Sequence, residues 1–546
     1  MMKRNRPHSR ITLALTSVGI MVAALLSGCT SDSPASSDSP GSTDSSGSAG
    51  NSDTSSALVV DTPDGAVQGV VVGEAEAFYG LPFAKPPVYD AMWTAPADPE
   101  PWEGTRDARK QAPACLQFEP TGVTNAQPTS LDCLYLDVYR PKDIAAGEKL
   151  PVMVFYHGGG NTQGSGVLYG GQTLAERERV ILVSTNYRLG ASGNFALAAL
   201  NAEDPSTGGA FALLDQIKAL DWVHRSIESF GGDPNNVTIF GQSAGAQAVC
   251  KLLVAPGSEG LFHKAIVQSI GCAMNLGIAD QETAEAASET YAEALGCPAG
   301  DDQLNCLRYA WPAAMVTAFS DAKPMSIVGS GALPVAPSAG ISEGSWHKVP
   351  VIVGSTRWES RLFRQADHAI TAEQYEAEVR ETYGDNAERV LATYPEANYE
   401  SPFQALSALG TDTMMACAAE DNAVMFNGQG VPTYKYEFDD PTSPTLFGFQ
   451  PEGVDMASAH SAELAYLFDF TLGDRPLTDD ETKLAHTMQD YWAAFARDGV
   501  PTSEGAAEWP AYTADNPVTL SLGPTITTID DFTTVHNCDL VAELAK

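Results

Sequence analysis

Short, fully apolar runs alternate with amphipathic stretches through the middle of the chain. Consecutive hydrophobic positions are typical of strands that are buried on both faces of a parallel sheet. The runs are 150–156, 180–184, 237–240, 265–268 and 349–353. Between the second and third runs, apolar residues recur at helical spacing over 210–230. The order strand, helix, strand predicts an α/β fold with a central, mostly parallel sheet and helices on both faces.

Two later stretches, 281–320 and 371–394, are rich in Ala and Glu and predict helices that cover the sheet or form a lid over it. No internal repeat and no second linker interrupts residues 58–546, so these residues are expected to form one large domain. Apolar residues make up 44% of the chain and charged residues 18%, which is enough to supply a sizeable core.

The first 57 residues follow a different pattern. Residues 1–28 begin with a basic segment and continue into the apolar run 11–26, which is short for a membrane span and suits an export signal. The run ends in Leu-Ser-Gly-Cys29, which resembles the bacterial lipoprotein box. Residues 29–57 are almost wholly small or polar and predict a disordered tether. We therefore expect an exported lipoprotein that meets the cell membrane only through a lipid on Cys29; an ordinary cleaved signal is the alternative.

The charge balance excludes one class of partner. The chain has 31 Lys and Arg against 69 Asp and Glu, for a formal net charge of −38. Such a surface repels phosphate backbones, so nucleic acid is not an expected partner, and strongly anionic substrates are disfavoured. Much of this charge is simply that of a soluble surface.

A candidate nucleophile follows the third apolar run. Residues 237–240 lead directly into Gly-Gln-Ser-Ala-Gly at 241–245, and a helix-compatible stretch follows at 247–253. This strand–turn–helix setting is typical of a nucleophile elbow, in which the serine hydroxyl stands at the carboxyl edge of the sheet. Ser243 is therefore the candidate nucleophile of a serine ester hydrolase. The alternative is an incidental serine in a glycine turn.

A second glycine-rich loop follows the first apolar run. His-Gly-Gly-Gly at 157–160 places backbone amides where a substrate oxygen can approach them without obstruction, as an oxyanion hole requires. A phosphate-binding loop is the competing interpretation. The loop lacks the Gly-Lys-Ser/Thr ending of such loops, and the acidic chain disfavours phosphate.

Several segments together resemble one enzyme family. Residues 230–245 are similar to the active-serine signature of the type-B carboxylesterase/lipase family, which includes cholinesterases, liver carboxylesterases and bacterial para-nitrobenzyl esterases. Residues 79–87, 132–139 and 186–190 match further family segments in the same order. The resemblance extends from about residue 58 to the end. It implies the α/β-hydrolase fold and hydrolysis of small-molecule carboxylic esters through an acyl-enzyme, with no cofactor and no metal.

The resemblance also assigns the acid and the base. Residues 354–360, which follow the last apolar run, resemble the family's acid loop and imply that Glu359 is the acid. The base follows the acid in the chain order of α/β-hydrolases. The histidines in that part of the chain are His368, His460, His486 and His536. Only His460 lies in a segment similar to the family's Gly-x-x-His-x-x-Glu-Leu pattern. The resemblance further implies that the amides of Gly159, Gly160 and Ala244 form the oxyanion hole.

Eight cysteines remain besides Cys29, an even number that favours disulfides in an oxidising compartment. No pair has CxxC or CxxH spacing, so a zinc site has no support. Spacing does not determine the connectivity. By resemblance the expected disulfides are Cys115–Cys133, Cys297–Cys306 and Cys417–Cys538. Cys250 and Cys272 are left over, free or paired with each other.

Departures from the family pattern narrow the substrate. Gln242 stands where the family usually has Glu, so one negative charge is missing from the pocket. Asn161 stands where an aromatic residue is common, and the segment between Cys115 and Cys133 has no Trp. These changes disfavour a cholinesterase and predict small to medium neutral esters. The alternatives to such an esterase are a true lipase and a binding module that has lost catalysis. The oligomeric state is left open.

Overall fold

The computed structural model describes residues 58–117, 128–319, 323–446, 453–470 and 473–546. The expected signal segment, Cys29 and the tether lie outside the described residues. So does the segment 118–127 between the first two cysteines of the fold. The residues from 58 onward belong to one compact unit.

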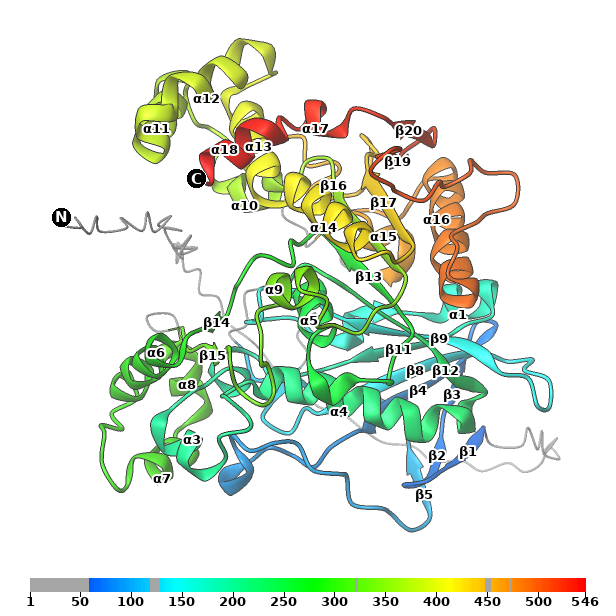
Figure 1. Ribbon diagram of the computed structural model, residues 1–546. Helices are drawn as coiled ribbons and strands as arrows, with labels where there is room; N and C mark the ends of the chain where they lie inside the picture. The colour runs from blue at the N-terminus through cyan, green and yellow to red at the C-terminus, as the bar shows by residue number, and fades with distance from the viewer. Residues whose placement is uncertain (1–57, 118–127, 320–322, 447–452, 471–472) are drawn as a thin grey trace, which may run out of the picture. The chain divides into compact units, whose positions relative to one another are not determined.

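In this part of the chain an eleven-stranded sheet forms the centre, in the order β20-β19-β17-β16-β13-β12-β9-β11-β8-β4-β3 (Figure 1). The strands are β3 (Val70–Val72), β4 (Ala75–Pro82), β8 (Tyr135–Pro141), β9 (Leu150–Tyr156), β11 (Ile181–Thr185), β12 (Gly232–Gln242), β13 (Lys264–Gln268), β16 (Val351–Thr356), β17 (Thr433–Phe438), β19 (Thr519–Leu522) and β20 (Thr527–Ile529). Neighbours from β11 across to β19 pair in parallel, and the strands at both edges pair antiparallel. The predicted mostly parallel sheet is confirmed.

All five apolar runs lie in strands of this sheet, but one boundary differs clearly. The run 237–240 is only the end of β12, which begins at Gly232. The residues between contain Asp, Pro and Asn, and they include a shift of register between Gly232 and Val237 against β9. Polar residues at an irregular strand start carry no apolar signal, so the pattern located only the regular part.

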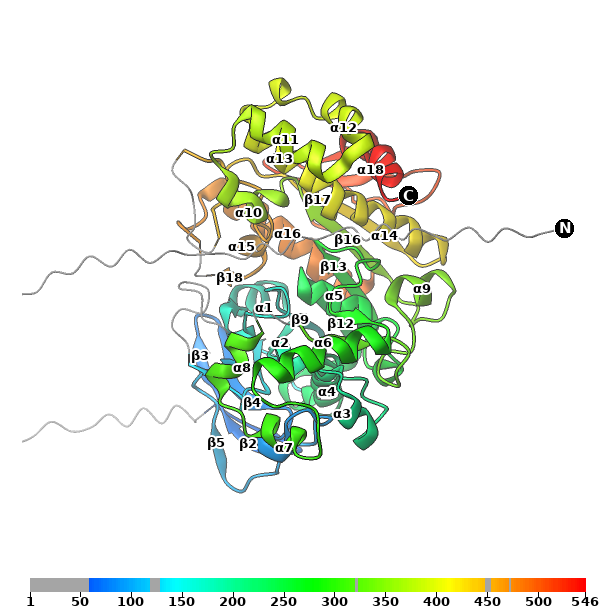
Figure 2. The ribbon, with the colours of Figure 1, turned by 90° about the vertical axis from the view of Figure 1, so that its left-hand side faces the viewer.

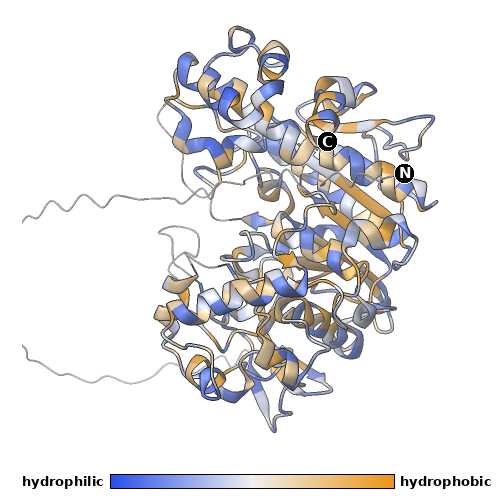
Figure 3. Cartoon of the chain, turned by 60° about the vertical axis from the view of Figure 1, so that its left-hand side comes forward, coloured by the Kyte–Doolittle hydropathy of each residue, from blue (hydrophilic) through white to orange (hydrophobic). Residues whose placement is uncertain are grey.

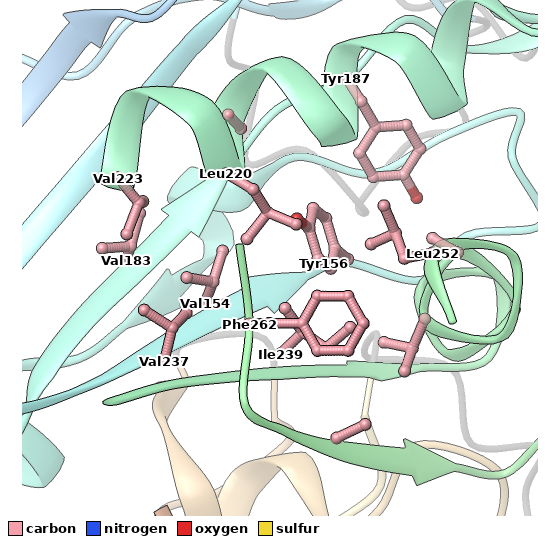
Figure 4. Close-up of a cluster of buried hydrophobic side chains, with 14 of the residues drawn as sticks. Val154, Tyr156, Val183, Tyr187, Leu220, Val223, Val237, Ile239, Leu252 and Phe262 are labelled. Atoms are coloured by element: carbon pink, nitrogen blue, oxygen red, sulfur yellow. The ribbon is translucent and has the colours of Figure 1, made fainter. Parts of the chain in front are cut away.

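Helices cover both faces of the sheet. One core cluster joins Val154 and Ile239 to α4 (Phe211–Ser226) and α5 (Ala244–Leu252) on one face (Figure 4). A second cluster joins Met153 and other strand residues of opposite orientation to α1 (Gln172–Glu178) and α16 (Asp479–Asp498). Because successive side chains of a strand point to opposite faces, β9 is buried at every position. Figure 3 shows the hydrophobic residues concentrated along these central strands.

The predicted helix 210–230 is present as α4, followed by a 3₁₀ turn at Ile227–Phe230. Gly231, with φ 86°, ends that turn before β12. The Ala- and Glu-rich stretches are helical as predicted. The first contains α6 (Gln281–Ala294), α7 (Gln303–Arg308) and α8 (Pro312–Ala318); the second contains α11 (Ala372–Tyr383) and α12 (Ala387–Thr393). Figure 2 shows them as two separate groups, with α6 to α8 in one and α11 to α12 in the other.

Four disulfides link the fold. Three are the pairs that the family resemblance implies: Cys115–Cys133, Cys297–Cys306 and Cys417–Cys538. The fourth joins Cys250 to Cys272, the pair that the sequence left open. It ties α5 to the chain that follows β13. Over the described residues no helix combines the length and apolarity needed to cross a bilayer.

Candidate active site

Ser243 occupies a sharp turn between β12 and α5. Its backbone has φ 58° and ψ −124°, which is unusual for a residue with a side chain and marks local strain. Its amide donates to the carbonyl of Gln268 on β13 at 2.9 Å, and its carbonyl accepts from the amide of Gln247 at 3.0 Å. These bonds hold the strained turn at the carboxyl end of β12. The structure therefore has the elbow geometry that the motif predicts.

The glycines on both sides of Ser243 are required by space. A Cβ at Gly241 would lie 2.4 Å from the carbonyl carbon of Gly245, and a Cβ at Gly245 would lie 1.8 Å from the carbonyl oxygen of Tyr156. No side chain fits at such distances. The missing Cβ at Gly241 lets the turn close on itself, and the missing Cβ at Gly245 lets the elbow pack against β9.

The triple-glycine loop lies directly beside Ser243. A Cβ at Gly158 would be 3.2 Å from the Cβ of Ser243. Gly159 and Gly160 have φ of 104° and 65°, values that favour glycine, and the carbonyl of Gly159 accepts bonds from the amides of residues 162 and 163. Ala244 is the first residue of α5, where helix amides have no intrahelical partner. Their use as oxyanion donors stays a prediction.

Glu359 and His460 are joined by a short hydrogen bond. Nδ1 of His460 lies 2.5 Å from Oε2 of Glu359, and both side chains are buried. Oε1 of Glu359 accepts from the amide of Thr356, the last residue of β16, at 2.8 Å. Glu359 is 0% exposed, so its carboxylate is not a solvated surface group. The second carboxylate bond fixes the orientation in which Glu359 meets the imidazole.

The loop that carries His460 is held against the acid loop by Arg361. The Arg361 guanidinium donates to the carbonyl of Ala457 at 2.6 Å and pairs with Asp455 at 2.9 Å. The amide of Trp358 also donates to the carbonyl of Ser458. Both loops are thus bonded at several points, which keeps His460 in reach of Glu359.

Nε2 of His460 faces Gln242, the residue before Ser243. The side-chain nitrogen of Gln242 lies 3.2 Å from Nε2. Among the hydrogen bonds of the described residues there is none between Nε2 and the hydroxyl of Ser243. Catalytic hydrogen bonds are commonly long without substrate and close in the substrate complex. The structure therefore brings the candidate acid and base together, and Ser243 directly follows in sequence the residue that contacts the candidate base. Sequence reasoning noted Gln242 only as a missing charge.

The other late histidines lie elsewhere. His368 is exposed, and His486 lies half-buried on α16. His536 is buried: its Nδ1 meets Asp412 at 2.6 Å and its Nε2 meets Glu437 at 2.5 Å. No sequence motif marked this cluster. Only His460 among the four approaches the elbow.

Glu463, three residues after His460, is also buried. Its Oε1 accepts from the side chain of Gln268 at 3.3 Å. Burial, with the nearby charge of Glu359 adding to it, raises the pKa of Glu463 to about 8. This carboxyl is therefore mostly protonated at neutral pH, so it adds little negative charge to the site.

Asn161, which stands where the family commonly has an aromatic residue, is bonded to α5. Its amide donates to Oε1 of Gln247 at 2.8 Å, and Nε2 of Gln247 donates to the carbonyl of Leu276 at 2.7 Å. These bonds connect the triple-glycine loop to the elbow helix and to the chain after β13. Sequence reasoning missed Gln247, because nothing local pairs it with Asn161.

A cavity of about 150 Å³ opens beside the same loop. Its lining is mostly apolar, and it includes Thr162, Gln163, Leu189, Met315, Val316 and Phe319. Thr162 and Gln163 are the residues whose amides bond to Gly159, so one wall of the cavity continues from the loop. In the described part of the chain no group of three or more His, Cys, Asp or Glu side chains is arranged to hold a metal ion.

A family model described as the carboxylesterase family matches residues 56–541. The chain belongs to this family. Fumonisin B1 esterase of Sphingopyxis macrogoltabida is 35% identical to this chain over 480 residues, which cover 83% of this chain and 84% of that protein. Para-nitrobenzyl esterase of Bacillus subtilis (strain 168) is 32% identical over 497 residues, covering 87% and 96%. A solved structure of PNB esterase is similar with a TM-score of 0.72 at 31% identity, covering 87% of this chain and 97% of that one.

These likenesses establish the coarse function. The carboxylesterase has the α/β-hydrolase fold and is a serine carboxylic ester hydrolase. The expectation drawn from the motifs is therefore confirmed at the level of fold, family and reaction.

Proposed function

We propose that the carboxylesterase cleaves small to medium, neutral carboxylic esters with Ser243 as nucleophile, His460 as base and Glu359 as acid. The observation that carries the proposal is the 2.5 Å bond between His460 and Glu359 beside the strained elbow of Ser243. A buried carboxylate on Nδ1 holds the imidazole in the tautomer whose Nε2 carries a lone pair, and it stabilises the imidazolium when it forms.

The reaction then follows from the positions of these groups. His460 takes the proton of Ser243 as the hydroxyl oxygen attacks the ester carbonyl. The amides of Gly159, Gly160 and Ala244 bind the oxyanion of the tetrahedral intermediate, and each such donor typically lowers the barrier by about 3 kcal/mol. The intermediate collapses as the C–O bond to the alcohol breaks and His460 gives its proton to the leaving oxygen. Water repeats the sequence on the acyl-enzyme.

Two features support neutral substrates of modest size. Gln242 contributes no charge beside the base, and Glu463 is mostly protonated at pH 7. The cavity of about 150 Å³ beside the triple-glycine loop has the size of a dry cavity that holds one benzene ring. A short acyl chain would fit this space, which Thr162 and Gln163 line next to the triple-glycine loop and to which neither Ser243 nor His460 contributes.

The decisive experiment compares hydrolysis of p-nitrophenyl esters from acetate to palmitate by wild type and Ser243→Ala. Ser407→Ala is a matched control, because Ser407 is buried in α13 (Pro402–Thr411) with an unpartnered hydroxyl. We expect Ser243→Ala to lose about 10⁴-fold or more in kcat, and Ser407→Ala to keep its activity. Equal rates for wild type and Ser243→Ala would refute the proposal.

The same assay separates the alternatives. Activity that falls with acyl length supports an esterase, and activity confined to the longest chains indicates a lipase. A folded wild-type protein that hydrolyses none of the esters indicates a binding module.

We also propose that the carboxylesterase is exported as a lipoprotein, with residues 1–28 removed and Cys29 lipidated. The four disulfides support an oxidising compartment. Membrane fractionation of a bacterial host that produces the full chain tests this. Wild type should sediment with membranes and Cys29→Ser should not; membrane association of both proteins would contradict lipidation at Cys29.

A further inference from the structure

Gln242 lies between the candidate base and the triple-glycine loop. It is the last residue of β12 and is 1% exposed. Its side-chain nitrogen faces Nε2 of His460 at 3.2 Å, and its Oε1 lies 3.0 Å from the point that a Cβ at Gly158 would occupy. A buried carboxamide thus fills the space beside the imidazole nitrogen that catalysis uses.

The chemistry of this contact selects one form of His460. A carboxamide nitrogen only donates hydrogen bonds, so Nε2 must accept, and it can accept only while it carries a lone pair. Nδ1 then carries the ring proton and donates it to Glu359 at 2.5 Å. With the carboxamide nitrogen facing Nε2, the contact from Gln242 therefore exists with the neutral ring and is lost when Nε2 is protonated.

We propose that Gln242 is a positioning residue, which holds the neutral His460 ring from the side opposite Glu359 and gives way to Ser243 in each turnover. The inference rests on the proposed triad. When Ser243 Oγ attacks, its proton moves to Nε2, the bond from Gln242 breaks, and the lone pair becomes an N–H. The same proton leaves with the alcohol, the lone pair returns, and the Gln242 bond forms again. No proton is gained or lost over the cycle.

This arrangement has a consequence for pH. Protonation of the free enzyme at Nε2 costs the hydrogen bond from Gln242, so the active neutral ring persists to lower pH. A glutamate at position 242 would act in the opposite sense, because its carboxylate accepts a hydrogen bond from the imidazolium. Among the described residues, the charged or titratable groups near the ring include Glu359 at Nδ1, Glu463 in the same loop, and Tyr436, which the charges of both carboxylates affect. Arg361, paired with Asp455, binds the loop that carries the ring. None of these changes when residue 242 is replaced.

The test is the pH profile of kcat/KM for p-nitrophenyl acetate with wild type, Gln242→Met and Gln242→Glu, with product release followed at a pH-independent wavelength. Gln242→Met removes the donor without adding charge, and we expect the acid limb to move up by about one pH unit, the equivalent of one hydrogen bond. Gln242→Glu places a negative charge beside the imidazolium. It should move the acid limb further upward, by about one to three pH units.

The matched control is Gln489→Met. Gln489 is also buried, and its side chain donates to the carbonyl of Tyr466, away from His460. Its acid limb should coincide with that of wild type. If both Gln242 variants keep the wild-type acid limb, the inference is wrong even though the enzyme is active and depends on Ser243. If Gln242→Glu fails to fold, the shift of Gln242→Met alone decides. Loss of the Ser243 dependence itself would instead overturn the proposed triad.

Discussion

Nδ1 of His460 and Oε2 of Glu359 lie 2.5 Å apart although 101 residues separate them in the chain. Glu359 follows β16 at the carboxyl edge of the sheet. His460 lies in a loop that Arg361 and Trp358 bond to the same edge. Because both side chains are buried, water does not weaken the bond. The bond places a candidate acid and base at the same edge of the sheet as Ser243, and the three residues together form a candidate catalytic site.

Replacing Glu359 by Gln tests this bond directly. The amide keeps the size of the side chain, but one of the two accepting oxygens becomes an NH2 donor and the negative charge that stabilises the imidazolium is lost. We expect kcat for p-nitrophenyl acetate to fall by about 10³–10⁴-fold with little change in KM. Thermal unfolding of the purified variant verifies that it is folded. A folded Glu359→Gln enzyme with near wild-type kcat would exclude Glu359 as the acid.

A methyl group at Gly245 should disrupt the elbow. Its Cβ would lie 1.8 Å from the carbonyl oxygen of Tyr156, so Gly245→Ala must displace Ser243 or β9. We expect a loss of about 100-fold or more in kcat/KM, because displacements of about 1 Å have effects of this size. Gly428→Ala is the control. Gly428 ends α14 (Cys417–Gly428) and nothing lies within 4 Å of its Cβ position, so stability should be equal or slightly higher. Hydrolysis and denaturant unfolding measure both variants.

The buried cluster around His536 should make stability depend on pH. Burial lowers the pKa of His536, but the carboxylates of Glu437 and Asp412 outweigh it and raise the pKa above its ordinary 6.5. Burial likewise raises the pKa of Glu437, yet the charge of His536, with Arg357 adding to it, lowers that pKa below 4.5. The stabilisation from His536 is complete below pH 6.5 and is lost as pH rises through its raised pKa. That from Glu437 is lost as pH falls through its lowered pKa.

Denaturant unfolding across this range measures the effect. The contribution of the cluster to the free energy of unfolding should be largest between about pH 4.5 and 6.5 and should decline above that window. His536→Ala removes the cation that two buried carboxylates share, although Glu437 keeps Arg357 at 3.6 Å and Asp412 keeps the Tyr394 hydroxyl at 2.8 Å. We expect a cost of about 3 kcal/mol at pH 6. His368→Ala, at an exposed histidine, serves as the control. An unchanged pH dependence in His536→Ala would contradict this reasoning.

The disulfide that closes the longer loop should stabilise the fold more, because the loop-closure entropy grows with the logarithm of loop length. Cys250–Cys272 spans 22 residues and Cys417–Cys538 spans 121. Loop-closure entropy predicts a loss of about 3 kcal/mol when the first pair is replaced by Ala and about 5 kcal/mol for the second. Urea unfolding of the two double variants measures this order. A larger loss for the shorter loop would indicate that local packing, not chain entropy, dominates.

Features that depend on neighbouring residues could be predicted from the sequence. The apolar runs that form β9, β11, β13 and β16 are strands because their side chains suit burial on both faces of a sheet. The turn at Ser243 is encoded by two glycines, since any Cβ there meets the backbone. The apolar pattern did not predict the start of β12, because the residues there are polar.

The tertiary structure alone decided the contacts between distant residues. Gln242 meets His460, Asn161 meets Gln247, Cys250 bonds to Cys272, and His536 enters a pair of carboxylates; each contact depends on which loops the sheet brings to one edge. A pattern of apolar and polar positions, or a short motif, predicts the turn or strand in which a residue lies. It does not record a partner far along the chain, because that partner is selected by strand order and packing.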